Sequence, residues 1–446
     1  MNIETFKTAI LTVLVGMSLA LTYSLWTYQP NSDAQSNTKY IQDVPAVAKK
    51  EMNEVVYPSR VAIHTENSHK VSYSNSLNAS LYRLLEKGEF QNLHDRSASV
   101  AKDEFLSFMH GKGKMEFVFP AEISLHTIRK VLNFKDKDIE DYSFDRIVID
   151  TAESRDNNVD VYFVSYEARK VYEAVMKGVA LKDLEREQAA IKEKAPSYFL
   201  YKLNETKAVF LPEASTSLPR KLYVTSNLLE EQFKNVLFTD PRYVKKDDAG
   251  SSDVYTDGTR LLRIFKENRM LRYENPTVSG SQYLIGSSLV QQSVDFVNSH
   301  GGWSDTYRLD EIQAKRGKAI FRVYEGDLPV FNANGMAALK LTWGTNELKA
   351  YERPLFRLFL EKKEEDQVSL PSGQAIQAFI EKSNKVNMQG IEDINVGYEL
   401  EPQLGLENEH LVAVKLNPIW YIKYNDRYVK VTVSDAGGEI SGLEQN

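Results

Sequence analysis

The sequence predicts an α+β fold in which a single N-terminal transmembrane helix precedes a multi-domain extracytoplasmic region of antiparallel sheets with packed helices. Three observations predict this fold. One segment near the N-terminus carries no formal charge, the rest of the 446 residues alternates between strand-like and helix-like hydrophobic patterns, and short turns separate neighbouring strands. With 42% hydrophobic residues, including 24 Tyr and 20 Phe, the chain has enough apolar surface to build cores.

The transmembrane helix is predicted from Thr8–Gln29, a segment without a charged residue and rich in Leu, Ile and Val. A helix of about 20 residues crosses the roughly 30 Å hydrocarbon layer of a bilayer. A cleaved signal peptide has a shorter apolar stretch that ends in small residues, whereas aromatic residues stand at the distal end here. We therefore predict a retained anchor, with membrane-interface residues Lys7, Tyr23, Trp26 and Tyr28.

The orientation is predicted mainly from the lengths on the two sides of this helix. Residues 1–7 form a short stub in which Lys7 is offset by Glu4, so the positive-inside bias is weak. Export of the long C-terminal side is more common than translocation of such a short N-terminus. We expect a single-pass protein of the cell membrane, with its N-terminus in the cytoplasm and its bulk outside.

Small residues recur every four positions along the predicted transmembrane helix and so share one face. In lipid, helix association depends on close packing, and small side chains let two backbones approach. Gly, Ala, Ser and Thr are also common in membrane helices for other reasons, so ordinary composition is the alternative. We interpret this stripe as a partner-binding face formed by Thr8, Thr12, Gly16, Ala20 and Ser24.

In the first unit after the linker, the hydrophobic pattern predicts strands and a surface helix. Strand character is found at Arg60–His64, Met115–Pro120, Phe144–Asp150 and Val159–Tyr166, and Leu181–Lys194 has a helical pattern rich in Glu, Lys and Ala. Further along, Lys221–Thr225 predicts a strand, Leu228–Phe238 a helix and Val254–Tyr273 a meander.

In the C-terminal part, the sequence pattern predicts two copies of one motif, a helix followed by three strands. The first copy has its helix at Ser288–Ser299 and the second at Gln374–Glu381. The expected strands of the two copies are Thr306–Gln313, Ala319–Val330 and Ala337–Trp343, and then Ile394–Glu401, Val412–Tyr424 and Arg427–Val433.

These patterns predict seven consecutive parts of the chain. They are a cytoplasmic stub (1–7), the transmembrane helix (8–29), a linker (30–54), an N-terminal α+β ectodomain (55–206), a central α+β unit (207–285), the first helix-plus-three-strand repeat (286–360) and the second (361–446).

The composition excludes several function classes. The chain has no cysteine, which excludes disulfides, thiol catalysis, Cys-ligated zinc and iron–sulfur clusters. The net charge of −7 argues against nucleic-acid binding, because phosphate contacts need an excess of clustered Lys and Arg.

Individual motifs do not predict an enzyme. Ser99 and Lys102 match the Ser-x-x-Lys pattern of penicillin-binding enzymes, but the companion motifs are missing or out of order. The seven histidines lack the spacing of a zinc protease and are interpreted as surface or turn residues. Asp247–Asp253 departs from a calcium loop at required positions and is expected to be a solvated loop. We therefore predict no catalytic, cofactor-binding or metal-binding residues and no cofactor.

Three segments resemble the YycH family. They are Lys7–Thr12, Ser24–Pro30 and the turn Asp257–Leu262, and the resemblance runs on to the Ile419–Tyr421 hairpin. Members of this family are membrane-anchored accessory proteins of the YycG/YycF (WalK/WalR) two-component system, which governs cell-wall metabolism. The resemblance implies an α+β ectodomain without enzyme activity. It also implies two protein partners beside the membrane, a sensor histidine kinase of the YycG/WalK type and a sister regulator of the YycI type.

The function expected from this resemblance is modulation of a sensor histidine kinase through protein–protein contact. Two alternatives come from other function classes. One is an exported cell-wall hydrolase with a carboxylate pair assembled by folding, and the other is a ligand-binding sensor module for wall-derived signals.

Overall fold

The computed structural model describes residues 7, 11, 14–19, 21, 22 and 48–446, except 67, 137–141, 156–157, 280–285, 346, 363–365, 384–385, 406–409, 435–436 and 444–446. The chain divides into two compact units, Met1–Pro45 and Ala46–Asn446. All described residues of the first unit are helical, and the second unit contains two large sheets with their helices.

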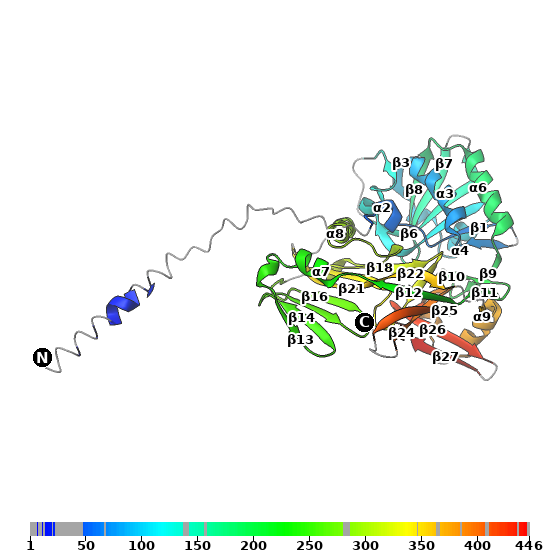
Figure 1. The fold of residues 1–446 in the computed structure, drawn as a ribbon. Coiled ribbons are helices and arrows are strands. Elements are labelled where there is room, and N and C mark those ends of the chain that lie inside the picture. The colour runs from blue at the N-terminus through cyan, green and yellow to red at the C-terminus, as the bar shows by residue number, and fades with distance from the viewer. Residues whose placement is uncertain are drawn as a thin grey trace. The chain divides into compact units, whose positions relative to one another are not determined.

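The first sheet has the strand order β10-β9-β2-β1-β4-β6-β7-β8-β3-β5 and is antiparallel except where β3 pairs with β5. Its strands β1, β3, β6, β7 and β8 are labelled in the upper right of Figure 1. Its strands are β1 Arg60–His64, β2 His69–Ser72, β3 Glu89–Asp95, β4 Lys114–Ser124, β5 Asn133–Phe134, β6 Ser143–Arg155, β7 Asn158–Ser165, β8 Lys170–Lys177, β9 Ser197–Lys202 and β10 Ala208–Pro212. The helices of this part are α2 Met52–Val55, α3 Asn75–Lys87, α4 Phe105–His110, α5 Leu125–Ile128 and α6 Leu181–Lys194.

Helices cover both faces of the first sheet. Side chains on both sides of its central strands are therefore buried, which explains why the sequences of these strands are continuously apolar. Successive strand side chains point to opposite faces. In β6, Ile147 and Ile149 belong to the main core together with residues of α3 and α6. Val148 lies on the other face and packs in a smaller cluster with Phe105 and Met109 of α4.

The second sheet follows the order β13-β14-β15-β16-β21-β20-β18-β19-β24-β25-β12-β22, with β17 beside β18 and with β26 and β27 continuing from β25. Its strands are β12 Lys221–Asn227, β13 Lys245–Asp248, β14 Ser252–Thr256, β15 Leu261–Phe265, β16 Met270–Glu274, β17 Tyr307–Gln313, β18 Lys318–Glu325, β19 Leu328–Phe331, β20 Ala338–Trp343, β21 Leu348–Pro354, β22 Phe356–Lys362, β24 Ile391–Leu404, β25 Leu411–Tyr424, β26 Arg427–Ser434 and β27 Gly437–Gly442. A separate pair joins β11 Thr216–Pro219 to β23 Gln367–Leu370.

Three helices pack against this part of the chain: α7 Glu230–Leu237, α8 Gly286–Ser299 and α9 Gly373–Lys382. On α8, the ring of Phe296 contacts Trp343 of β20 and Tyr351 of β21. The Trp343 indole N–H also donates to the Ser293 hydroxyl at 2.9 Å, so its polar atom is satisfied inside the core. One face of β20 and β21 is therefore buried under α8.

The two sheets are joined by direct polar contacts as well as by a shared apolar core. Arg60 of β1 makes two hydrogen bonds, of 2.8 and 2.9 Å, to the carboxylate of Asp393 in β24. Arg308 of β17 donates to the carbonyl of Pro58 at 3.2 Å. Residues 46–446 consequently form one compact body.

Most of the predicted elements occur at their expected places, but the single predicted strand Ala319–Val330 was wrong, because the chain turns back there and forms the antiparallel strands β18 and β19. The strand Arg60–His64 and the helix Leu181–Lys194 have the predicted bounds, and both C-terminal motifs contain a helix followed by an antiparallel meander. Strand Gly437–Gly442, which pairs with β26, was not predicted. Strands β21 and β22 were not predicted. Every strand after β11 except β23 belongs to the second sheet. This sheet contains strands from both sides of the expected domain boundaries at 285 and 360. Those boundaries stay predictions.

Candidate functional site

The predicted transmembrane stripe lies almost wholly outside the described residues. Among its members the structure describes Gly16, at which an added Cβ would meet no atom within 4 Å. Of the predicted interface residues it describes Lys7. The apolar side chains described in this helical segment are 53–66% exposed: Leu11, Leu14, Val15, Met17, Leu19 and Leu21. Within the described residues, no helix combines the length and hydropathy that a membrane span requires.

Ser99 and Lys102, which match a catalytic pattern in sequence, lie on the surface. Ser99 is an exposed residue of a short 3₁₀ turn. The ammonium of Lys102 forms a 3.0 Å ion pair with Glu205, and both side chains are more than half exposed. A lysine that activates a serine needs desolvation and a direct approach to the hydroxyl, and this exposed pair offers neither feature.

The interpretation of all histidines as surface or turn residues was wrong for His64 and His110. His64 is fully buried and His110 is 6% exposed. They come from the ends of β1 and α4, and both reach the buried carboxylate of Glu116 on β4. No spacing rule finds this cluster, because three separate elements bring its members together.

Glu116 is the centre of this buried network. Its Oε2 atom lies 3.2 Å from His64 Nε2 and 3.1 Å from His110 Nδ1, and its Oε1 atom lies 2.8 Å from Arg146 Nε. Burial by itself raises the pKa of Glu116, but the neighbouring His110, His64 and Arg146 outweigh burial and hold that pKa well below its usual range. Glu116 is therefore a buried carboxylate.

Each of the two buried histidines directs one ring nitrogen at Glu116 and the other at a further polar side chain. His64 donates to Glu116 from Nε2, and its Nδ1 accepts from His69 Nδ1 at 2.8 Å. His110 donates to Glu116 from Nδ1, and its Nε2 lies 3.0 Å from the oxygen of the Tyr166 hydroxyl, which itself donates to the Ala208 carbonyl at 3.2 Å. Burial lowers the pKa of His64, and burial followed by the neighbouring His64 lowers the pKa of His69 to about 4.

The same three groups have the donor types of a metal site, since ligand atoms of His64, His110 and Glu116 lie within 4.8 Å of one another. In the proton arrangement described above, each of these atoms already has a hydrogen-bond partner, and Arg146 balances the charge of Glu116. The cluster is complete as a structural network that ties α4 to β1 and β4.

The prediction of a solvated loop at Asp247–Asp253 was wrong in part, because this segment contains the end of β13, a short turn and the start of β14, where Ser252 and Asp253 are buried. Its carboxylates bind lysines: Asp248 lies 2.7 Å from Lys266, and Asp253 lies 2.6 Å from Lys246. The hydrogen bond from Lys266 holds the pKa of Asp248 below its ordinary value. These side chains stabilise the hairpin.

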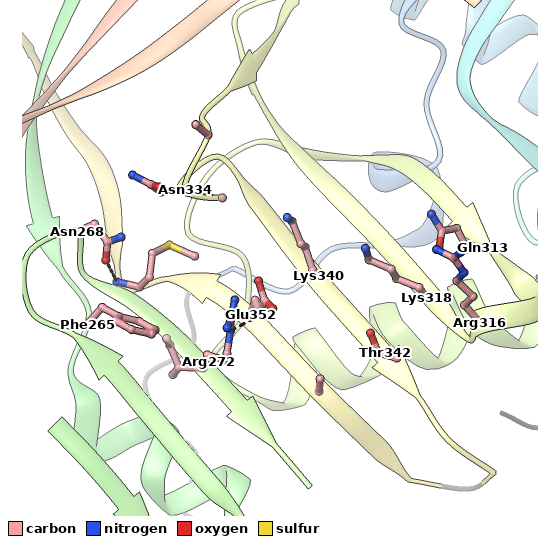
Figure 2. A pocket seen from close by; sticks show the side chains of 15 residues that line it. Phe265, Asn268, Arg272, Gln313, Arg316, Lys318, Asn334, Lys340, Thr342 and Glu352 are labelled. Carbon is pink, nitrogen blue, oxygen red and sulfur yellow. Dashed lines mark hydrogen bonds and ion pairs between the residues drawn. The ribbon is translucent and has the colours of Figure 1, made fainter. Parts of the chain in front are cut away.

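A concave surface was not predicted from the sequence. Figure 2 shows the residues that line a cleft over β16, β21, β20 and β18. The volume of this cleft is about 580 Å³. Lys318 and Lys340 stand on its sheet floor, Arg316 and Gln313 lie at one end, and Asn334 lies on the loop before β20. Only the strand register reveals this group, because it places residues from distant segments on one face.

Comparison with known proteins identifies relatives along nearly the whole chain. The model of the YycH protein N-terminal domain matches residues 4–193, and that of the YycH protein C-terminal domain matches residues 206–438. A curated relative, the two-component system WalR/WalK regulatory protein YycH of Bacillus subtilis (strain 168), is 24% identical over 446 residues and matches over 97% of each chain.

The fold also matches a solved structure. The crystal structure of YycH from Bacillus subtilis aligns with a TM-score of 0.73 and 21% sequence identity, covering 86% of this chain and 97% of that chain. The mixed, sheet-rich α+β architecture is thus shared. With both domain models matched in their proper order, the chain belongs to the YycH family.

Proposed function

We propose that this protein is a membrane-anchored extracytoplasmic regulator that modulates a sensor histidine kinase controlling cell-wall metabolism. The observation that carries this proposal is the match over 97% of both chains to a protein named as a WalR/WalK regulator. The kinase partner would accordingly be of the YycG/WalK type, and a sister regulator of the YycI type would be a second partner.

The charge-free segment Thr8–Gln29 supports membrane anchoring, because its length and hydropathy suit a single span. With residues 1–7 in the cytoplasm, the compact body Ala46–Asn446 would stand outside the membrane. The stripe that includes Gly16 and Ala20 would then face a transmembrane helix of the kinase or of the sister regulator.

The regulator would act by binding one conformation of the kinase more tightly than another. A partner shifts an equilibrium only by its difference in affinity for the two states. Couplings of this kind are typically about 1–3 kcal/mol, which changes a population roughly 5- to 150-fold. Such a mechanism needs surface complementarity and no catalytic group, in keeping with the exposed positions of Ser99 and Lys102.

Affinity purification from detergent-solubilised membranes tests this proposal. The tagged full-length protein should recover a histidine kinase of the YycG/WalK type. A matched control carries the same body, residues 30–446, on an unrelated single-pass helix, and it separates contacts within the membrane from contacts of the body. If the native protein recovers no histidine kinase at normal abundance, the proposed function is wrong.

A further inference from the structure

The cleft of Figure 2 concentrates positive charge in an acidic protein. Among the described residues that line it are four cationic side chains and one carboxylate, so the formal charge of this lining is +3: Arg272, Arg316, Lys318, Lys340 and Glu352. The whole chain carries −7. A cleft lined by one sign of charge focuses the field and attracts ligands of the opposite sign.

In the described part of the chain, three of these cations, Arg316, Lys318 and Lys340, form no ion pair with a carboxylate within 4.0 Å, and Glu311 acts on Lys318 only at longer range. Glu352 is engaged by Arg272, whose Nε lies 3.2 Å from Oε1. Arg316 contacts the side-chain oxygen of Gln313, which is neutral. The Lys340 ammonium reaches toward the Gly335 turn, where it would lie 3.9 Å from an added Cβ. Arg316, Lys318 and Lys340 can therefore all donate to an added anion.

The strand register places the floor of the cleft on one face of the sheet. Lys318 is opposite Thr342, and both Lys340 and Arg272 are opposite Glu352. Residues paired across neighbouring strands share a face. The opposite face, with Leu341 and Tyr351, is buried in the main core. This placement puts Lys318 and Lys340 at diagonal positions roughly 7 Å apart, a spacing that two charge contacts to one ligand can bridge.

The walls of the cleft are fixed by buried hydrogen bonds. Asn332 is 6% exposed, and its side-chain oxygen accepts from the backbone N–H groups of Asn334 and Met336 at 2.8 and 3.2 Å. Its amide group donates to Leu400 of β24 at 2.8 Å. The turn that carries Asn334 is thus held against the second sheet. A preformed wall lowers the entropy cost of binding a ligand.

At the other end, Gly317 fixes the position of the turn that carries Arg316. Its φ of 62° lies in the left-handed region, and an added Cβ would come within 2.5 Å of the Trp343 carbonyl oxygen. A side chain is therefore excluded by both the backbone conformation and the close neighbour. This close approach places Arg316 at the end of the lysine-bearing floor.

The outer face of an antiparallel sheet is often polar and solvated, and Lys is common there. Two features distinguish this face from such a surface. It is hollowed to about 580 Å³, within the range of small-molecule sites, and its unpaired charges are all positive. Neutral donors and acceptors, including Gln313, Asn334 and Thr342, also line the cleft.

We propose that this cleft binds a phosphate ester that carries hydroxyl groups. Lys318, Lys340 and Arg316 contact the phosphate oxygens, since guanidinium and ammonium groups form strong charge-assisted hydrogen bonds to phosphate. Thr342, Asn334 and Gln313 contact the hydroxyls. This binding site is separate from kinase regulation and does not depend on it.

Calorimetry on the full-length protein in neutral detergent tests the proposal with two soluble probes. Glycerol 1-phosphate represents a free phosphomonoester, and glycerophosphoglycerol represents the phosphodiester of a lipid headgroup. Binding of either probe supports the site, and the tighter probe identifies the source of the ligand. Uncharged glycerol should not bind. If neither phosphate ester binds, the proposal is wrong.

Variants assign any binding to this cleft. Lys318→Gln and Lys340→Gln should each weaken binding by roughly tenfold, the loss expected for one charge-assisted contact. The matched control is Lys349→Gln, which makes the same charge change at an exposed position of β21 outside the cleft and should leave affinity unchanged. Equal affinity in the three variants would overturn the assignment.

A second variant keeps the test valid if a lysine substitution disturbs folding. Glu352→Gln removes the one carboxylate of the cleft and frees Arg272. It should tighten binding of the phosphate ester severalfold, because only a cleft-bound anion gains from this change. Weaker or unchanged binding in a folded Glu352→Gln protein would contradict the proposed site.

Discussion

The ion pair between Arg60 and Asp393 is a residue-scale contact whose loss should lower stability. Both residues are largely buried, with side-chain exposures of 9% and 22%, and the pair joins β1 to β24 across the two sheets. Burial raises the pKa of Asp393, but Arg60 outweighs it and holds that pKa below its ordinary value. Asp393→Ala should lower the unfolding free energy by about 3 kcal/mol, because the Arg60 charge stays buried without its partner.

Urea unfolding at neutral pH measures this loss. Glu66→Ala is the control, because it also removes a carboxylate from an ion pair, but Glu66 and Lys112 are about 70% exposed. An exposed pair of this kind contributes less than about 1 kcal/mol. Equal losses in the two variants would show that the contact between the sheets is not held by this pair.

The buried histidine network predicts a loss of stability in mild acid. His64 and His69 have lowered pKa values in the folded protein, that of His69 to about 4, whereas an unfolded histidine titrates near 6.5. Between these values the unfolded chain binds more protons, so the unfolding free energy falls as the pH falls from about 6.5 to about 4. The slope is at most about 1.4 kcal/mol per pH unit for each histidine.

Unfolding measured between pH 7 and pH 5 tests this dependence above the range of most carboxylates. His69→Gln retains a donor for His64 but cannot titrate, so its slope should be smaller than that of the native protein. His410→Gln is a matched change at an exposed position and should keep the native slope. If the unfolding free energy of His69→Gln depends on pH as steeply as that of the native protein, the pH dependence arises from other groups.

At the scale of a single element, the N-terminal helix carries the prediction about partner contact. Gly16→Leu combined with Ala20→Leu adds bulk where two backbones must approach. Insertion should persist, because Leu favours the bilayer interior. Co-purification of the kinase or of the sister regulator should weaken by on the order of 1 kcal/mol, together with the output of a kinase-dependent reporter.

Leu14→Ile is the control for the helix variant, since it lies away from the stripe and retains an apolar side chain. It should leave co-purification unchanged. If the double Leu variant inserts, accumulates and still co-purifies at the native level, the stripe is ordinary membrane-helix composition. The contact would then lie in the body formed by residues 46–446.

At the scale of the whole molecule, the proposed orientation can be tested by labelling, because the native chain has no cysteine. Glu185→Cys introduces one thiol at an exposed position of α6. A membrane-impermeant maleimide added to intact, wall-stripped cells should label this variant, since the body is proposed to lie outside the membrane.

Thr5→Cys provides the opposite control in the predicted cytoplasmic stub, and it should be labelled only after lysis. The two variants differ from each other only in the position of the thiol. Labelling of Thr5→Cys but not of Glu185→Cys in intact cells would reverse the proposed orientation.

Local pattern alone determined much of the secondary structure. The bounds of Leu181–Lys194 could be predicted because its buried residues, Leu184, Gln188 and Ile191, repeat with the helical period. Arg60–His64 could be predicted as a short strand from its own few residues, all of which are buried. The resemblance in Lys7–Thr12 and the Asp257–Leu262 turn also indicated the family that the domain models identify. These signals need no knowledge of which distant segments meet.

Tertiary structure decided the contacts that matter most for the candidate sites. The Glu116 network combines the ends of β1 and α4 with β4, the cleft combines four strands through their register, and Arg60 meets a carboxylate 333 positions away. In the sequence alone, each of these residues looks like an ordinary polar residue. Its role depends on desolvation and on a neighbour brought near by folding, and neither quantity is encoded in local periodicity.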